Sequence, residues 1–306
     1  MMEKINDVKL QEKNNANDLV KQMENTGFQA THLSQAVDLI EKMKKENCTI
    51  FLGFTANMMA SGLRGIVKEL CEKKFVDAIV TTAGSIDHDI IKSQMPYLKG
   101  TFNSNDVELH QKGINRLGNI FVETKGFEML EEKMQAWLKE ISEKEKVISP
   151  SELTKFIGEK LPEESFLHWC TKNDIPMFCP GVTDGAIGLQ MYFFKQENKD
   201  FIVDVTKDMK GLADLVLEAD KTGAIILGGG ISKHHIIGAN IIRDGLDYAV
   251  YVSTASEFDG SLSGAQTREA KSWGKIKEQG KNVQVNCDTT IAQPLMIGAL
   301  KERGTL

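Results

Sequence analysis

Polar and reactive side chains crowd the stretch from residue 251 to residue 276: Thr254, Glu257, Asp259, Ser261, Ser263, Glu269, Trp273 and Lys275. Such density is typical of a functional site. Helical spacing places Glu269 and Trp273 on one face, and Lys275 follows a glycine that would end the helix. A lysine beside an indole can act as a nucleophile that forms a Schiff base. The stretch is therefore a candidate site for such chemistry, although composition and spacing alone do not select Lys275 from the other lysines.

Schiff-base chemistry needs a neutral lysine, and a pKa of about 10.4 leaves roughly one amine in a thousand or fewer neutral at pH 7. The indole of Trp273 would supply an apolar wall, and the pair His234-His235 could pass protons. Glu269 would favour the charged lysine, and so we assign it to the substrate amine or to proton transfer. A lysine near a tryptophan is also common on solvated surfaces, and a His-His pair can simply begin a helix. Spacing alone leaves these alternatives open.

Three turns of small residues could hold a cofactor, since each follows an apolar run and precedes a helical pattern: Phe54-Thr55-Ala56-Asn57, Thr81-Thr82-Ala83-Gly84-Ser85 and Gly228-Gly229-Gly230. At the carboxyl edge of a parallel sheet, such turns offer unpaired N–H groups to a ligand. None has the G-x-G-x-x-G fingerprint, and glycine also serves tight turns that bind nothing. Three turns of one form favour a shared nucleotide cleft.

The elements that must position these residues alternate along the chain. Apolar, β-branched runs predict buried parallel strands at residues 49–53, 78–81, 119–122, 177–179, 224–227, 249–252 and 283–285. Helical patterns lie between them at residues 32–45, 58–73, 127–144, 208–219 and 290–303. The alternation predicts an α/β fold with a single doubly wound, mainly parallel sheet and helices on both faces, Rossmann-like in type.

Composition and organisation bound the class of protein further. We expect an N-terminal arm over residues 1–30, polar and free to fold onto another subunit, and a single catalytic domain over residues 31–306. The net charge of -6, without a long basic run, argues against nucleic acid as a partner. The apolar runs are too short to cross a membrane, so we expect a cytoplasmic protein. The five cysteines form no C-x-x-C pair and suggest neither a metal site nor a disulfide framework.

Four motifs, in order and spacing, closely resemble the deoxyhypusine synthase family: Gly228-Gly229-Gly230-Ile231-Ser232-Lys233-His234-His235, Asp247-Tyr248-Ala249-Val250-Tyr251, Glu257-Phe258-Asp259-Gly260-Ser261 and Ser272-Trp273-Gly274-Lys275-Ile276. Further matches lie at residues 51–55, 80–84, 113–119 and 183–185. The resemblance extends over nearly the whole chain from about residue 48 onward.

This resemblance implies an NAD-dependent aminobutyl transferase with a deoxyhypusine synthase-type NAD-binding fold. In the family, NAD takes a hydride from spermidine, diaminopropane leaves as a lysine takes the aminobutyl group, and the group passes to a lysine of the hypusine-containing translation factor. The stored hydride reduces the final imine. The resemblance also implies a homotetramer with sites at a dimer interface.

Roles carried over by position make Lys275 the imine-forming lysine, His234 the active-site histidine, and Glu269 with Trp273 the groups on the spermidine side. Residues that fall where the family contacts NAD are Asn57, Thr82, Ala83, Gly84, Asp184, Gly229, Thr254, Asp259 and Asp288. We add Gly260, Ser261 and Asp87 as candidate substrate contacts.

Two aspartates that the family uses beside spermidine are apolar here, as Leu189 and Leu262. Burying a polyammonium without carboxylates is costly. Three interpretations follow. The amine could be held instead by Asp87, Glu257, Asp259 or Glu269; the chain could transfer aminobutyl between small amines, as a homospermidine synthase does; or it could be a non-catalytic NAD-binding assembly partner. The retained Lys275, Glu269 and His234 favour an active enzyme.

Overall fold

A computed structural model describes residues 3–306 and divides the chain into two compact units. Among the described residues, the first unit contains residues 3–54, 73–80 and 211–306, and the second contains residues 55–72 and 81–210. Each unit thus gathers segments that are distant in the sequence, whereas the sequence predicted one domain for residues 31–306. The boundary between residues 210 and 211 falls within helix α11 (Lys207–Glu218).

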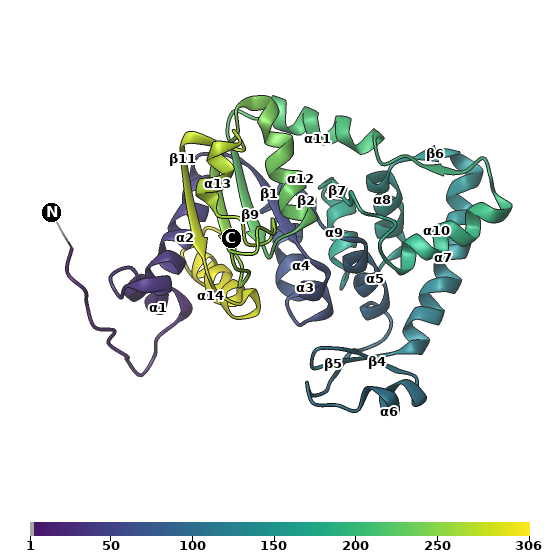
Figure 1. The fold of residues 1–306 in the computed structure, drawn as a ribbon, viewed down its shortest axis with the longest axis horizontal. Coiled ribbons are helices and arrows are strands. Elements are labelled where there is room, and N and C mark those ends of the chain that lie inside the picture. Colours follow the sequence, from purple (N-terminus) through teal and green to yellow (C-terminus); the bar gives the residue numbers. More distant parts are fainter. Residues whose placement is uncertain (1–2) are drawn as a thin grey trace. The chain divides into compact units, whose positions relative to one another are not determined.

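The first unit is built on a parallel sheet in the order β11-β10-β9-β1-β2 (Figure 1). Its strands are β1 (Thr49–Phe54), β2 (Ala78–Val80), β9 (Thr222–Leu227), β10 (Leu246–Val252) and β11 (Ile276–Val285). Leu52 pairs with Ile79 on one side and with Ile225 on the other, so β1 and β9 are central and almost wholly buried. Strands buried on both faces read as continuous apolar runs, which is why the sequence located them.

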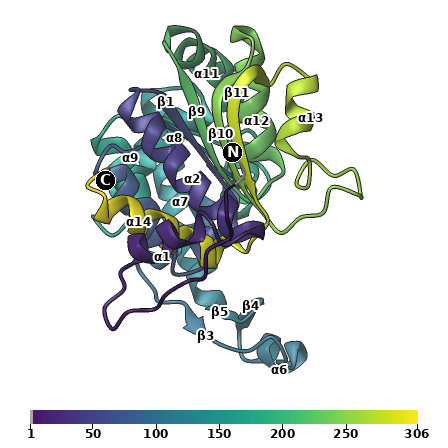
Figure 2. The ribbon, with the colours of Figure 1, turned by 90° about the vertical axis from the view of Figure 1, so that its left-hand side faces the viewer.

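Helices cover both faces of this sheet. Helices α2 (Phe28–Lys45) and α14 (Thr289–Glu302) lie on one face and α12 (Ile231–Ala239) lies on the other (Figure 2). The unit also contains the 3-10 turn η1 (Asn240–Arg243) and α13 (Thr267–Ser272). The predicted α/β fold, with a mainly parallel sheet and helices around it, is confirmed.

Part of the expected N-terminal arm is helical and packs within its own unit. Helix α1 (Ala16–Met23) begins with a capping box made by Asn15 and Asp18. Arg303 Nε donates to Asn17 Oδ1 at 2.7 Å, and the Asn17 N–H donates to Glu302 at 2.7 Å. These bonds attach α1 to the end of α14.

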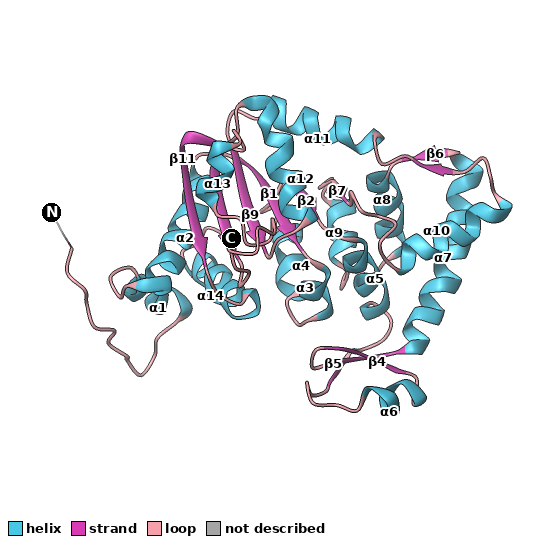
Figure 3. Cartoon of the chain, viewed as in Figure 1, coloured by secondary structure: helices cyan, strands magenta, loops and turns pink. Residues whose placement is uncertain are grey.

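The second unit is mainly helical (Figure 3). Its helices are α3 (Ala56–Ala60), α4 (Arg64–Glu72), α5 (Ala83–Lys92), α6 (Asp106–Gln111), α7 (Thr124–Lys144), α8 (Pro150–Lys160), α9 (Phe166–Lys172) and α10 (Ala186–Glu197). Its short strands are β3 (Leu98–Lys99), β4 (Ile114–Leu117), β5 (Ile120–Glu123), β6 (Val147–Ile148), β7 (Met177–Phe178) and β8 (Ile202–Val203). Strands β6 and β8 pair in parallel.

Two sequence predictions are wrong in this unit. The run at residues 119–122 was expected in the parallel sheet, but β5 pairs antiparallel with β3 and β4. Gly118, at φ 60°, and Asn119 form the two-residue turn of a β4–β5 hairpin, which glycine permits. The single helix expected at residues 58–73 is interrupted between α3 and α4, where Ser61 Oγ accepts from the Leu63 N–H at 3.2 Å.

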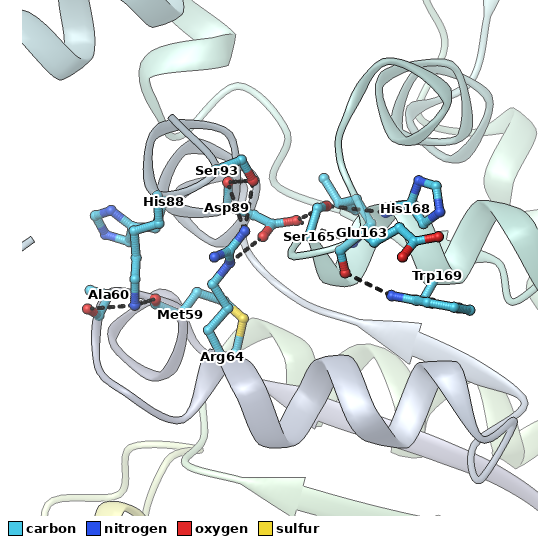
Figure 4. A network of polar contacts seen from close by, with 12 residues as sticks. Met59, Ala60, Arg64, His88, Asp89, Ser93, Glu163, Ser165, His168 and Trp169 are labelled. Atoms are coloured by element: carbon cyan, nitrogen blue, oxygen red, sulfur yellow. Dashed lines mark hydrogen bonds and ion pairs between the residues drawn. The ribbon is translucent and has the colours of Figure 1, made fainter. Parts of the chain in front are cut away.

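A buried ion pair holds α5 in the second unit (Figure 4). Arg64 Nε donates to Asp89 Oδ1 at 2.5 Å, and Asp89 Oδ2 accepts from Ser165 Oγ at 2.6 Å and from the Leu167 N–H at 3.1 Å. Asp89 is fully buried, so its charge is satisfied from α4 and from the start of α9 at once. The network fixes the helix that begins at the Thr82-Ala83-Gly84 turn.

Candidate active site

Lys275 lies immediately after the turn that ends α13. Gly274 has φ 65°, the Lys275 N–H donates to the Ala270 carbonyl at 2.9 Å, and the Gly274 N–H donates to the Lys271 carbonyl at 3.0 Å. This pair of bonds is a Schellman motif, in which glycine adopts the left-handed conformation. On the other side, the Lys275 carbonyl accepts from the Leu246 N–H at 3.1 Å, and β11 begins at the next residue. The backbone of Lys275 is therefore fixed on both sides, as the glycine signal predicted.

The side chain of Lys275 lies beside Trp273. Its Nζ is 5.3 Å from the centre of the indole ring, and the lysine is half-buried. Trp273 is 66% exposed, and Glu269 on the same helix is also exposed. The arrangement presents an amine, an indole and a carboxylate on one accessible surface of the first unit.

His234 belongs to α12, whose first residues follow the glycine turn. Its backbone N–H donates to the Gly230 carbonyl at 3.0 Å. Burial lowers the pKa of His234, and the charge of Lys275 lowers it further. A pKa below the ordinary histidine value leaves most of the imidazole neutral at pH 7. A neutral imidazole is the form that can accept a proton.

The segment between β10 and α13 carries four further predicted residues. Thr254, Asp259, Gly260 and Ser261 are all exposed. Asp259 Oδ1 accepts from the Ser261 N–H at 2.7 Å, and Gly260 has φ 73° with open space where a side chain would lie. Asp259, Gly260 and Ser261 form a tight polar turn on the surface of the first unit.

Gly229 has a structural explanation that the sequence did not reveal. A Cβ at this position would lie 2.5 Å from Ser263 Cα, so the segment before α13 packs directly on the glycine turn. Asp288 also has a visible role, because its Oδ1 accepts from the Thr290 N–H at 2.7 Å and caps α14. Asp288 remains exposed. Contacts of both residues with a cofactor stay predictions.

Lys233 was not among the predicted site residues, although it precedes His234 in the glycine-turn motif. It is 2% exposed, and its Nζ donates to the carbonyls of Leu262 at 2.9 Å and Ala265 at 2.5 Å. The Nζ also lies 4.5 Å from the centre of the Tyr251 ring. Burial lowers the pKa of Lys233 to about 8. Its position in the motif was the available signal.

The remaining cofactor candidates lie in the second unit. Thr82, Ala83 and Gly84 form the turn into α5, and no side chain caps the first turn of this helix. Thr82 Oγ1 is buried and has no hydrogen-bond partner among residues 3–306. Asn57 is exposed in α3, and its Oδ1 accepts from Thr55 Oγ1 at 2.5 Å. Asp184 is exposed in the turn before α10.

Asp87 caps the start of α10. Its two carboxylate oxygens accept from the Ala186 N–H at 2.8 Å and the Ile187 N–H at 2.9 Å. Burial raises the pKa of Asp87 to about 6, although the two backbone donors act in the opposite direction. The carboxylate is 4% exposed and engaged within the second unit. Its predicted substrate contact stays a prediction.

The structure thus brings most of the chemically active candidates together in the first unit. These are Lys275, Trp273, Glu269 and His234, with the 259–261 turn on the segment that Lys233 holds. The second unit gathers Thr82, Ala83 and Gly84 at the head of α5, with Asp87 within the same helix. The fold and this site define a parallel α/β enzyme with a candidate nucleophilic lysine.

Comparison with known proteins identifies the family. The model of the deoxyhypusine synthase family matches residues 18–300. A "probable deoxyhypusine synthase" from Thermoplasma acidophilum is 43% identical over 89% of this chain and 88% of its own length. The deoxyhypusine synthase of the plant Senecio vernalis is 42% identical over 91% of this chain and 84% of its own. The chain belongs to the deoxyhypusine synthase family.

A solved structure agrees with this assignment. A crystal structure of an Entamoeba histolytica protein provisionally named deoxyhypusine synthase has a TM-score of 0.68 and 28% identity, and covers 93% of this chain and 92% of that one. AgrE in complex with ornithine and NAD+ has a TM-score of 0.56 at 15% identity, covers 90% of this chain and 33% of that one, and shows the fold alone. The predicted family, enzyme class and main function are confirmed, and the two alternatives are not supported.

Within residues 3–306, no helix is long and apolar enough to cross a membrane.

Proposed function

We propose that this chain transfers an aminobutyl group from spermidine, through an imine on Lys275, to a lysine of the hypusine-containing translation factor. The observation that carries the proposal is the accessible amine of Lys275, fixed by the Schellman turn and lying 5.3 Å from the Trp273 ring centre. The proposal is supported by membership of the deoxyhypusine synthase family.

Each nearby residue has a role in this proposal. The neutral amine of Lys275 attacks the imine carbon of the oxidised donor, and diaminopropane leaves. His234 takes up or returns the proton at the reacting nitrogen, because its lowered pKa keeps it neutral. Trp273 forms one wall beside the amine, with its ring centre 5.3 Å from the lysine Nζ.

Glu269 is our choice for the carboxylate that holds the donor amine. Leu189 and Leu262 offer no charge, and Asp87 is buried at the head of α10. Glu257 is paired with Arg268 at 2.6 Å. Glu269 is exposed on the helix that ends beside Lys275, and it has no salt bridge within the part of the chain that the structure describes.

NAD is the proposed cofactor, and it would supply the hydride acceptor that the oxidation of a secondary amine requires. The residues present fit such a group. Thr82 Oγ1 is a buried acceptor and donor without a partner in residues 3–306, and the first N–H groups of α5 and α12 are not capped by side chains. Free N–H groups at helix starts suit a phosphate. We therefore propose the Thr82-Ala83-Gly84 turn of the second unit and the Gly228-Gly229-Gly230 turn of the first unit, each taken by itself, as candidate nucleotide contacts.

The wider partners follow from the same proposal. Spermidine and the hypusine-containing translation factor are the proposed substrates, and a cytoplasmic homotetramer is the proposed assembly. Light scattering of the purified protein would measure the assembly, and a monomer would contradict it.

Trapping tests the reaction directly. The protein is incubated with NAD and spermidine labelled in its aminobutyl part, reduced with borohydride, digested and mapped by mass spectrometry. We expect label on Lys275, no label in Lys275→Arg, and release of label when the translation factor is added before reduction. Label on another lysine, or none with the folded protein, would contradict the assignment of Lys275. Trapping on Lys275 without transfer to the translation factor would contradict the proposed acceptor.

A further inference from the structure

We infer that Lys233 is a positioning residue, whose buried amine holds the segment between β10 and α13 in place and so fixes both the 259–261 turn and the start of α13. This inference rests on the proposed function, because it concerns the geometry of the same site. It assigns a role to a residue that takes no part in the reaction described above.

The burial of Lys233 calls for an explanation. Removing a lysine amine from water costs several kcal/mol unless its N–H donors find acceptors and its charge is compensated. Within residues 3–306, Lys233 has no carboxylate at salt-bridge distance, and its compensation comes from two carbonyls and the face of Tyr251. A leucine or methionine would fill the same space more cheaply. The amine is therefore placed for what it binds.

Its two partners lie on one short stretch of the segment. Leu262 directly follows Ser261, and Ala265 lies two residues before α13 begins. The rest of the segment is held mainly by itself: Asp259 accepts from Ser261 N–H at 2.7 Å, and Gly264 packs against the Ser256 carbonyl. Its contacts with the glycine turn and α12 include that of Ser263 with Gly229 and those of the two carbonyls with Lys233.

The same geometry excludes Lys233 as the nucleophile. Its amine is buried, and two carbonyl groups already occupy it. The neighbouring residue on α12, His234, is exposed. Helix α12 thus anchors the segment with one side chain and offers a proton carrier with the next.

Hydrogen exchange of the protein without substrate tests the inference. The variant is Lys233→Met, which keeps the length and apolar stem of the side chain and removes the donors. We expect amide exchange in peptides covering residues 253–266 to become at least 10-fold faster, with other peptides of the first unit unchanged. We also expect KM for NAD and for spermidine to rise by about 10-fold or more, with a smaller fall in kcat.

Lys44→Met is the matched control. Lys44 Nζ donates to the Phe75 carbonyl at 3.0 Å and lies 4.9 Å from the ring centre of Phe75. The Lys44→Met variant therefore loses the same kind of contact elsewhere in the first unit. Amide exchange of residues 253–266 and the KM values of this variant should match those of the wild type. If Lys233→Met does not fold, Lys233→Gln, which keeps two N–H donors on a shorter chain, takes the same measurements, again with faster exchange expected at residues 253–266.

Unchanged exchange of residues 253–266 in the folded variant would overturn the inference, whatever happens to activity. Trapping of labelled substrate on Lys233 would overturn it as well. Faster exchange in Lys233→Met, together with a wild-type protein that never traps label on Lys275, would support the positioning role and contradict the proposed function, so the two failures are distinguishable.

Discussion

Lys275 and Trp273 stand on either side of one glycine, and the lysine Nζ lies 5.3 Å from the centre of the indole ring. Gly274, at φ 65°, turns the chain so that the two side chains meet although the helix has ended. A side chain with a Cβ would resist this conformation. The contact therefore depends on the order Trp-Gly-Lys itself.

We expect Trp273→Ala to lower kcat/KM by about 10- to 100-fold, because the Lys275 side chain loses the ring that lies beside it and helps to position its amine. Steady-state kinetics with spermidine measures the change, and Trp273→Phe should lose less. Stability should change by less than about 0.5 kcal/mol, since Trp273 is 66% exposed.

Trp137→Ala is the control for this change. Lys133 Nζ lies 5.7 Å from the Trp137 ring centre, so the variant removes another indole that faces a lysine. Its kcat/KM should equal that of the wild type. Equal losses in both variants would show that Trp273 has no special role.

The pKa of His234 should rise when Lys275 is replaced by methionine. Burial lowers this pKa first and the lysine charge second, so removing the charge relieves only the second effect. NMR titration of the imidazole measures the pKa, with His234→Gln identifying its signal among the six histidines. The value should stay below about 6.5 in the wild type and move towards it in Lys275→Met.

The lowered pKa of His234 also makes the stability of the protein depend on pH. Because the pKa of His234 is lower in the folded state, the native protein binds fewer protons than the unfolded chain. The free energy of unfolding therefore decreases as the pH falls from about 6.5 through the folded pKa. His234→Gln should remove this part of the acid dependence of unfolding. An unchanged His234 pKa in Lys275→Met would place the two groups out of electrostatic contact.

Local signals explain what the sequence could predict here. The buried strands of the first unit are continuous apolar runs, and Gly274 is the signal that predicts the end of the helix before Lys275. Each depends on residues that are neighbours in the chain. The candidate nucleophile was chosen from such a signal together with the motif around it.

Distant contacts explain what the sequence could not predict. Lys233 donates to carbonyls that are 29 and 32 residues away, and nothing near Lys233 in the chain announces its burial. Asp87 caps a helix that begins 99 residues later. The antiparallel hairpin is a different case, because Gly118-Asn119 between two apolar runs was a usable turn signal.

Asp89→Ala should destabilise the protein by about 3–5 kcal/mol, because it leaves the Arg64 guanidinium, 11% exposed, without its buried partner. Denaturant unfolding measures the loss. The double variant Arg64→Met with Asp89→Leu should lose much less than the sum of the single changes, since no charge is then left unpaired. Additive losses would mean that the pair is not coupled.

Lys146→Ala is the control for this network. Lys146 pairs with Asp200 at 3.1 Å, and both side chains are more than half exposed. Exposed pairs contribute little, so the variant should unfold at nearly the wild-type denaturant concentration. The comparison separates the effect of burial from the loss of an ion pair as such.

Gly229→Ala should destabilise the protein by about 1–3 kcal/mol, because the added Cβ would lie 2.5 Å from Ser263 Cα and only a backbone shift can relieve the overlap. The shift would move the segment that carries Asp259 and Gly260, so KM for NAD should rise as well. Gly65→Ala in α4 is the control, since open space surrounds its Cβ and alanine favours a helix by about 0.5–1 kcal/mol. Denaturant unfolding and steady-state kinetics measure both variants. If Gly229→Ala were as stable as Gly65→Ala, packing of the segment on the glycine turn would not require glycine at position 229, and normal NAD binding by the variant would also exclude a requirement for this glycine at the cofactor.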